Sequence, residues 1–274
     1  MTFLKKNIIK NLIKSRDISS SKNNYGHAYL IAGHTKKMGA AVIAARACLR
    51  TGCGLLTVNL PKEERFILQT TIPEAMLTFR DKLEIDLDKY SAIGIGPGVG
   101  VTTNASIMLT QLFNNFKKPM ILDADALNVI AANKSFLKVI PNNTILTPHI
   151  KEFDRLFGTP VNSEERVKIA LNVAKKYKVI IVLKTHQTLV TDGNLSFINT
   201  TGNTGLAKGG SGDALTGMIT SFLAQGYPPL AAAKIGVYLH GLAADIALKN
   251  QSVESMLITD VIECLGKAFK LTVK

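Results

Sequence analysis

The sequence predicts one α/β domain, with a mainly parallel central sheet and helices on both of its faces. Two observations lead to this prediction. Short apolar runs alternate with longer helical patterns, and most of the runs lack the period-2 alternation of half-exposed strands. Strands covered on both faces have this pattern, and a repeated β-then-α order is typical of a parallel, doubly wound sheet. No repeat, low-complexity linker or domain boundary is evident, so residues 1–274 are interpreted as a single domain.

The expected elements follow from these patterns. The expected strands are Ala28–Ala32, Leu55–Asn59, Ala92–Ile95, Met120–Leu122, Thr144–Leu146 and Val179–Leu183. The expected helices are Gly39–Thr51, Glu63–Gln69, Asn104–Phe113, Ala126–Ala132, Lys151–Phe157, Ser163–Tyr177, Pro229–Leu248 and Ile258–Leu271. Thr188–Thr191 and Leu195–Asn199 flank the turn residues Asp192-Gly193-Asn194, which predicts a β-hairpin.

Composition narrows the class of protein. The net charge is +13, but the basic residues form short, scattered groups without aromatic interleaving, so nucleic acid is not an expected partner. No apolar run reaches the length that spans a bilayer, so no membrane partner is expected either. The cysteines Cys48, Cys53 and Cys264 lack metal-ligand spacing, and so sparse a set is typical of a reducing cytoplasm. Residues 1–24 are interpreted as a basic helical segment packed on the domain.

A glycine-rich loop is the most informative local feature. Thr201–Asp213 reads T-G-N-T-G-L-A-K-G-G-S-G-D, and it leads directly into a helical stripe formed by Leu215, Met218, Ile219, Phe222 and Leu223. The free amides and the dipole of a helix N-terminus form an anion site, and glycines let a phosphate approach the backbone. Asp213 would repel a resting phosphate, which favours a general base over a phosphate ligand. The alternative is an acid that only complements the helix dipole.

Polar and glycine-rich segments also follow successive expected strands, where ligands gather in open α/β sheets. A shared pocket is therefore predicted at this rim. The segments are Gly96–Gly100, Asp123–Asn128, Thr147–His149 and Lys184–Thr188.

Residues Gly202–Gly217 resemble the signature of the ribokinase-like superfamily, and more closely that of the NAD(P)H-hydrate dehydratase family. The resemblance extends from about Tyr25 to Lys249. It includes, in the order typical of the family, Tyr25–Gly33, Gly39–Ala45, Arg50–Val58, Pro73–Met76, Gly96–Gly100, Leu122–Asn128 and Leu146–His149.

The resemblance implies a ribokinase-like fold and a cofactor-repair activity. Family members restore NADH or NADPH from their C6 hydrates: a nucleotide phosphorylates the hydroxyl group, and elimination of phosphate regenerates the dihydropyridine. Bacterial members typically use ADP and release AMP, whereas eukaryotic ones use ATP. The implied cofactor is Mg²⁺, held mainly by nucleotide phosphates and water, and the implied assembly is a homotetramer.

The same resemblance implies residue roles. Asp213 would be the base, and the amides of Gly210, Ser211 and Gly212 would stabilise the transferred phosphoryl group. The nucleotide would lie along Lys184, Thr185, His186, Gln187 and Thr188, and the hydrated cofactor near Ala40, Gly98, His149 and Asp213.

Several roles remain open at the level of sequence. Asp123 and Asp125 either organise water around Mg²⁺ or cap the next helix, and Asn128 belongs to the same candidate group. His149 is either a cap or, preferably, a ligand contact. His240 is expected to be a hydrogen-bonded core residue, and Lys208 a surface lysine.

The sequence departs from the family pattern in three places. Thr185 replaces a usual glycine, His149 is followed by Ile150-Lys151, and the loop Gly33–Met38 lacks common polar residues. Two rival functions remain. One is a small-alcohol kinase of the same superfamily, such as a hydroxyethylthiazole kinase. The other is a nucleotide-binding regulatory protein without turnover.

Overall fold

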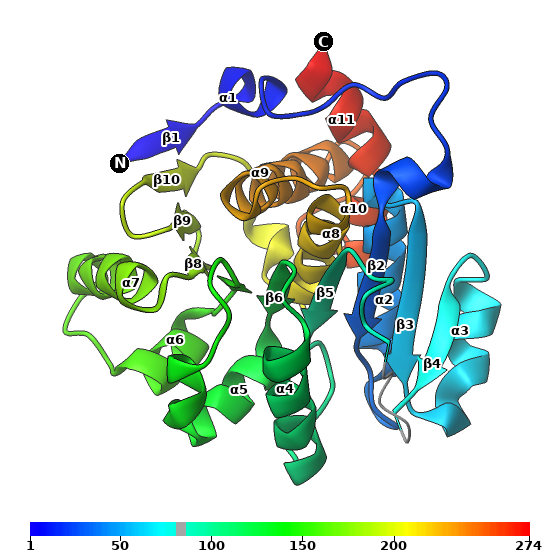
Figure 1. Cartoon of the computed structure of the whole chain (residues 1–274). Coiled ribbons are helices and arrows are strands. Elements are labelled where there is room, and N and C mark those ends of the chain that lie inside the picture. The colour runs from blue at the N-terminus through cyan, green and yellow to red at the C-terminus, as the bar shows by residue number, and fades with distance from the viewer. Residues whose placement is uncertain (81–85) are drawn as a thin grey trace.

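The computed structural model describes residues 1–80 and 86–274, which contain a ten-stranded sheet at the centre of the molecule (Figure 1). The strands lie in the order β1-β10-β9-β8-β7-β6-β5-β2-β3-β4. All neighbouring pairs are parallel except those of β9, which runs antiparallel to both β8 and β10. The strands are β1 Thr2–Leu4, β2 His27–Ile31, β3 Leu55–Leu60, β4 Met76–Phe79, β5 Ala92–Ile95, β6 Met120–Leu122, β7 Ile145–Leu146, β8 Ile180–Leu183, β9 Leu189–Thr191 and β10 Ser196–Asn199.

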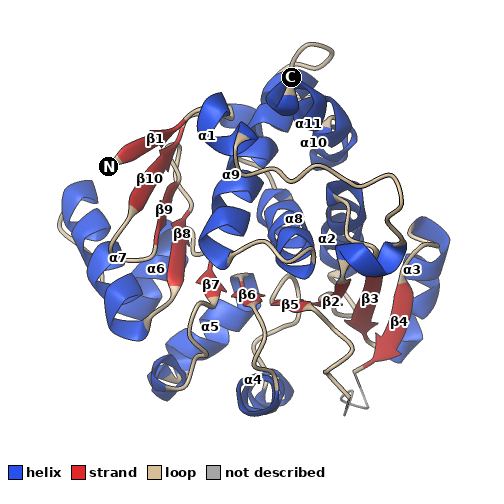
Figure 2. Cartoon of the chain, turned by 45° about the horizontal axis from the view of Figure 1, so that its top comes forward, coloured by secondary structure: helices blue, strands red, loops and turns tan. Residues whose placement is uncertain are grey.

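Helices cover both faces of this sheet (Figure 2). One hydrophobic cluster contains side chains of α2, α8, α9, α10 and α11, and a second contains those of α4, α5, α6 and α7. The predicted mainly parallel sheet with two helical layers is therefore confirmed. The helices are α1 Lys6–Lys10, α2 Met38–Thr51, α3 Arg65–Thr71, α4 Thr103–Asn115, α5 Ala124–Ala132, α6 Ile150–Phe157, α7 Ser163–Tyr177, α8 Ser211–Ala224, α9 Pro229–Ala247, α10 Ile258–Glu263 and α11 Leu265–Val273.

Strand β2 illustrates why the apolar runs lack alternation. Ala28 and Leu30 belong to the first cluster, whereas Tyr29 and Ile31 belong to the second. Successive side chains of a strand point to opposite faces, so a strand buried on both faces is apolar at every position. The predicted hairpin is also confirmed, because β9 and β10 pair antiparallel, with Leu189 opposite Ile198.

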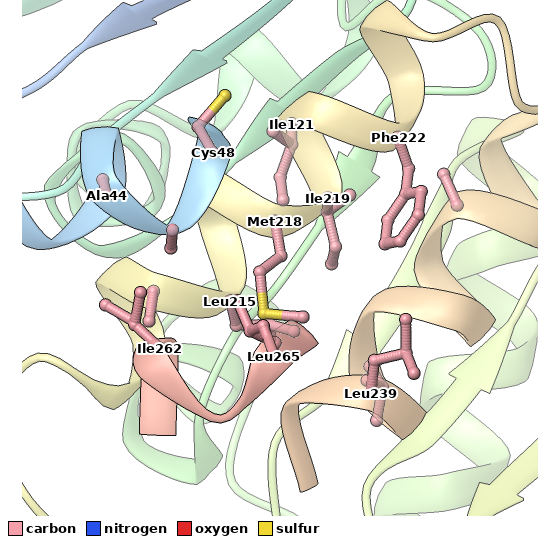
Figure 3. Packing of buried hydrophobic residues seen from close by; sticks show 14 of the residues in the cluster. Ala44, Cys48, Ile121, Leu215, Met218, Ile219, Phe222, Leu239, Ile262 and Leu265 are labelled. Atoms are coloured by element: carbon pink, nitrogen blue, oxygen red, sulfur yellow. The ribbon is translucent and has the colours of Figure 1, made fainter. Parts of the chain in front are cut away.

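Helix α8 is the central element of the first layer, and every residue from Ala214 to Ala224 is buried. In Figure 3, Met218, Ile219 and Phe222 on α8 lie among side chains of α2, α9, α10 and α11. Gly217 permits close packing on α2, because a methyl group at this position would lie 2.0 Å from the carbonyl oxygen of Ala44. This packing fixes the N-terminus of α8 relative to the sheet.

The two edge strands were not predicted. β4 is only half buried, so its pattern is weak, and β1 pairs with β10, nearly 200 residues along the chain. The expectation of a helical segment over residues 1–24 is therefore wrong at its start, where residues 2–4 form a strand and only Lys6–Lys10 form an α-helix. Local sequence patterns cannot show a pairing between such distant segments.

Two expectations for the C-terminal part also need correction. The single expected helix Ile258–Leu271 is two helices, α10 and α11, separated at Cys264. Helix α9 is long and apolar enough to cross a membrane by length and composition, so the expectation that no apolar run reaches this length is wrong. However, 72% of its apolar window is buried inside the protein, as in the core helix of a globular domain.

Candidate active site

The carboxyl ends of β6, β7 and β8 meet the N-terminus of α8 at one rim of the sheet. Because these three strands are parallel neighbours, Asp123, His149 and Lys184 follow adjacent strand ends. They line a pocket of about 810 Å³ together with Asp213, as expected for the ligand site of an open α/β sheet. The predicted shared pocket is present, but the Gly96–Gly100 segment does not contribute to its lining.

Asp123 and Lys184 form a buried ion pair in this pocket. Oδ1 of Asp123 accepts a hydrogen bond from Nζ of Lys184 at 2.7 Å, and Oδ2 accepts one from the hydroxyl of Thr216 on α8 at 2.7 Å. The residue is 1% exposed. Asp123 occupies the N-cap position of α5 but makes no side-chain cap, so the capping alternative is wrong for this residue.

Lys184 brings a positive charge to the first turn of α8. A methyl group at Gly212 would lie 3.1 Å from its Nζ. Burial acts to lower the pKa of Lys184, but the carboxylates of Asp123 and Glu152 outweigh burial and raise this pKa above its usual value. The ammonium group therefore stays charged beside amides that lack intrahelical acceptors, which together form an anion-binding arrangement.

Asp213 lies in the first turn of α8 and carries a perturbed carboxyl group. Burial, and then the charge of Asp123, raise its pKa to about 6, while Lys184 acts in the opposite direction. A general base works best when its pKa lies near the pH of the reaction. The environment of Asp213 therefore suits proton acceptance near neutral pH.

His149 and Glu152 form a reciprocal cap at the start of α6. Nδ1 of His149 accepts a hydrogen bond from the Glu152 amide at 3.3 Å, and the Glu152 carboxylate accepts one from the His149 amide at 2.8 Å. The cap considered for His149 is therefore present. Its side chain is 48% exposed and also lines the pocket, so the preferred ligand contact remains a prediction.

Glu152 lines the pocket but was not assigned a role from the sequence. Burial is the largest influence on its pKa, which is raised. The sequence signal was its position three residues after His149, at the start of a helical pattern, which is the spacing of a capping box.

The other predicted site residues fall into two groups. Thr185, His186, Thr188, Ser211 and Gly212 line the pocket. The residues outside its lining are Ala40, Gly98, Asp125, Asn128, Gln187 and Gly210.

Ala40 on α2 and Gly98 in the loop after β5 nevertheless lie close to each other. A methyl group at Gly98 would lie 3.2 Å from Cβ of Ala40. The nearby Asp125 accepts a hydrogen bond from the Gly100 amide at 2.9 Å and lies 3.6 Å from Nζ of Lys37. Asp125 acts to raise the pKa of Asp213 and Lys37 acts to lower it, so charges beside this loop influence the carboxyl group.

Asn128 does not line the pocket. Its Oδ1 accepts a hydrogen bond from Arg155 at 2.6 Å, which links α5 to α6. Its candidacy as a residue around Mg²⁺ or in the pocket stays a prediction. The side chain of Lys208 reaches the carbonyl oxygens of Glu254 and Met256, which anchors the glycine loop, although the residue also lines the pocket.

His240 on α9 differs from its expected state. It is 7% exposed, and its Nε2 has no hydrogen-bond partner among the described residues. Burial lowers its pKa to about 4, so the ring is neutral at physiological pH. The residue is buried as predicted, but it is not satisfied, and it lines the pocket. Its apolar helical context gave no signal of this.

The residues of the site do not form a protein metal centre. No group of three potential metal-ligating side chains occurs within residues 1–80 and 86–274. The carboxylate of Asp123 already bonds Lys184 and Thr216, and that of Asp125 bonds the Gly100 amide. The donor set fits a magnesium ion held mainly by nucleotide phosphates and water.

A parallel sheet whose strand ends and glycine loop enclose a lysine and a carboxylate at a helix N-terminus is the ribokinase-like arrangement. The chain superposes on a ribokinase-like protein from Enterococcus faecalis with a TM-score of 0.89 and 30% identity, covering 99% of this chain and 96% of that one. It also superposes on a hydroxyethylthiazole kinase from Pyrococcus horikoshii with a TM-score of 0.59 at 16% identity, covering 90% and 89%, which shows the shared fold alone.

Within this class, the family model described as NAD(P)H-hydrate dehydratase matches residues 28–267, and the chain belongs to this family. It is 33% identical to the ADP-dependent (S)-NAD(P)H-hydrate dehydratase of Enterococcus faecalis, over 98% of this chain and 93% of that protein. The ADP/ATP-dependent dehydratase of Bacillus subtilis, co-crystallised with ATP and Mg²⁺, superposes with a TM-score of 0.88 and 31% identity, covering 99% and 98%.

Some relatives are longer than this chain. It is 33% identical to the bifunctional NAD(P)H-hydrate repair enzyme of Moorella thermoacetica over 91% of its own length, but it spans about half of that protein.

Proposed function

We propose that this protein dehydrates the (6S)-hydrates of NADH and NADPH, with ADP as the preferred phosphoryl donor. The observation that supports this most strongly is Asp213 in the first turn of α8, which lines the pocket and whose burial raises its pKa to about 6. A carboxylate so placed serves as a base for a hydroxyl group better than as a phosphate ligand. The family membership points to the same reaction.

In the proposed first step, Asp213 accepts the proton of the C6 hydroxyl group as its oxygen attacks the terminal phosphorus of ADP. The bond from this phosphorus to the bridging oxygen breaks, and AMP leaves with the bonding electrons. The ammonium of Lys184 and the first amides of α8 stabilise the charge on the transferred group. Mg²⁺, when bound with the nucleotide, neutralises phosphate charge.

In the second step, the C6–O bond breaks and phosphate leaves with its electrons. Loss of a proton from C5 then forms the C5–C6 double bond of the dihydropyridine. The net products are NADH or NADPH, AMP and phosphate. Phosphorylation is needed because hydroxide is a poor leaving group.

The test is incubation of the purified protein with hydrated NADH, Mg²⁺ and either ADP or ATP. We expect recovery of dihydropyridine absorbance together with release of AMP, faster with ADP than with ATP. The control is Asp213→Asn, which keeps the size of the side chain. Equal turnover with ATP would contradict the donor preference alone. Phosphorylation of a thiazole alcohol without action on hydrated NADH would support the small-alcohol kinase, and tight nucleotide binding without turnover would support a regulatory protein.

We also propose a cytoplasmic homotetramer. Cys48, Cys53 and Cys264 are free thiols, as is usual in a reducing compartment. Most of α9 is buried in the core, so little of its surface is left for an interface between subunits. The exposed apolar residues near α10 and α11 are better candidates for that interface: Leu257, Leu271 and Val273. Light scattering at micromolar concentration tests this proposal, and a monomer would refute it.

A further inference from the structure

Asp123 is the most completely engaged carboxylate of the pocket. Its two oxygens bond two partners on different elements: Lys184 at the end of β8 and Thr216 on α8, both at 2.7 Å. Burial of a charged carboxylate that is 1% exposed is energetically unfavourable unless such partners offset the loss of hydration. Asp123 caps no helix, so this bonding pattern requires another explanation.

The explanation lies in the position of Lys184. A lysine has a flexible four-carbon stem, and its ammonium group has no fixed direction of its own. Here Asp123 fixes the ammonium, and Thr216 fixes Asp123 to the same helix whose first turn contains Gly212 and Asp213. The chain Thr216–Asp123–Lys184 therefore connects the reactive charge to the helix N-terminus near which it must act.

We infer that Asp123 is a positioning residue for phosphoryl transfer, which holds the Lys184 ammonium beside the first turn of α8 and adjusts the charge around Asp213. This inference rests on the proposed function and assigns to Asp123 a role distinct from both magnesium hydration and helix capping.

The charges around Asp213 give the inference a measurable consequence. Burial is the largest cause of the raised pKa of Asp213, and Asp123 is the next. Asp125 on α5 acts in the same direction, whereas Lys184 and Lys37 act to lower the pKa. Glu152 on α6 is a further carboxylate that influences Lys184. Removal of the Asp123 charge should lower the pKa of Asp213 for two reasons. It removes a negative charge that repels the ionised Asp213, and it leaves Lys184 without its ion-pair partner, so that its positive charge stabilises the ionised Asp213 more strongly.

The test variant is Asp123→Asn, and Asp125→Asn is the matched charge control. Asp125 also raises the pKa of Asp213 but has no contact with Lys184. We expect Asp123→Asn to lower kcat by about 10²-fold, because a misplaced reacting group typically costs about that factor. The acid limb of its pH–rate profile should shift to lower pH. In Asp125→Asn, which removes a charge that acts on Asp213 but leaves the Asp123–Lys184 ion pair in place, we expect a shift of the acid limb in the same direction.

The pKa of Asp213 is measured independently by ¹³C NMR of labelled aspartate carboxyl groups, assigned with Asp213→Asn. We expect a lower pKa in Asp123→Asn than in the wild type. This readout does not depend on turnover, so a wild-type protein that is inactive on hydrated NADH would refute only the proposed function. An unchanged Asp213 pKa and an unchanged kcat, with only a lower Tm, would overturn the inference.

Thr216→Val is the second variant, needed in case Asp123→Asn does not fold. It preserves all charges and the shape of the side chain but removes one hydrogen bond to Asp123. We expect a smaller loss of kcat than in Asp123→Asn, with the pH profile nearly unchanged. A Thr216→Val protein with wild-type kcat would contradict the positioning role.

Discussion

Two loops, one after β5 and one before α8, are both rich in glycine but have different physical roles. The loop Gly96–Gly100 after β5 is enclosed by protein, and the end of the loop 202–212 before α8 is open to the pocket. Gly96, Gly98 and Gly100 have positive φ in the first loop, and Gly202 and Gly210 in the second. The difference shows that a glycine-rich motif can serve chain packing as well as ligand approach.

The first loop needs its glycines for packing. Gly96 has φ of +136°, and a methyl group at this position would lie 1.8 Å from the carbonyl oxygen of Asp123. At Gly98 the neighbours are Lys37 and Ala40. Asp125 then accepts a hydrogen bond from the Gly100 amide. The protein itself thus holds this loop on several sides.

The second loop is anchored at its start and open at its end. Asp245 on α9 accepts hydrogen bonds from the amide of Gly202 at 2.9 Å and the side chain of Asn203 at 3.0 Å. A methyl group at Gly209 would meet no atom within 4 Å, and one at Gly212 would face the Lys184 ammonium. These two glycines leave room for a ligand.

The largest expected effect concerns the open loop, in Asp213→Asn. This nearly isosteric change removes the proton acceptor, and loss of a positioned general base typically lowers the rate by about 10²–10⁴-fold. Nucleotide binding should be retained or improved, because a negative charge near the phosphates is lost. Steady-state kinetics and calorimetric titration with ADP measure the two effects. Near-normal turnover would show that Asp213 is not the base, and joint loss of binding and stability would show a structural role.

The second prediction concerns the enclosed loop, in Gly96→Ala. The steric conflict with Asp123 and the unfavourable φ should together lower the free energy of unfolding by about 3–5 kcal/mol. The matched control is Gly158→Ala, which has φ of +96° but no neighbouring atom within 4 Å. It should cost only about 1–2 kcal/mol of backbone strain. Urea titration measures the free energy of unfolding of both variants. Equal losses in Gly96→Ala and Gly158→Ala would show that the close packing around Gly96 does not matter.

The third prediction follows from the pKa of Asp213. Because the folded-state value of about 6 lies above the ordinary value of 3.8, the proton stabilises the folded state, and this stability is lost as the pH rises from about 4 to 6. At pH 7 the ionised group therefore costs up to about 3 kcal/mol. Asp213→Asn should melt at a higher temperature than the wild type at pH 7, with a smaller difference at pH 4. Calorimetry at the two pH values tests the sign.

Wild-type activity should follow the same group. The base must be ionised, so kcat/KM should fall below about pH 6, approaching tenfold per pH unit. A pH–rate profile without an acid limb near this value would contradict the assignment.

The smallest expected effect is that of Gly209→Ala. Its φ is not positive and its surroundings are open, so the free energy of unfolding should change by less than about 0.5 kcal/mol. If this loop approaches the nucleotide, KM for ADP should rise while Tm stays constant. A large loss of stability would show that the second loop is packed like the first.

Much of the fold was predictable because its signals are local. The buried strands were recognised from continuous apolar runs, and α8 from its spacing of apolar residues after the glycines. The strand β4 was missed because it is only half buried and its apolar pattern is weak, and the three-residue β1 was missed because its partner β10 is nearly 200 residues away in the sequence. The break at Cys264 was missed because α10 and α11 together read as one continuous helical pattern of apolar residues.

For the site, the sequence by itself determined which chemical groups collect at one rim of the sheet. Strand order, glycines and the helix start placed Asp213, Lys184 and Asp123 there, because parallel strands end at a common edge. Only the tertiary structure decided what these groups do to one another. Asp123 is 61 residues from Lys184 and 93 from Thr216, so no local pattern could pair them. The raised pKa of Asp213 and the unpartnered Nε2 of His240 arise from burial, which is a property of the packed molecule.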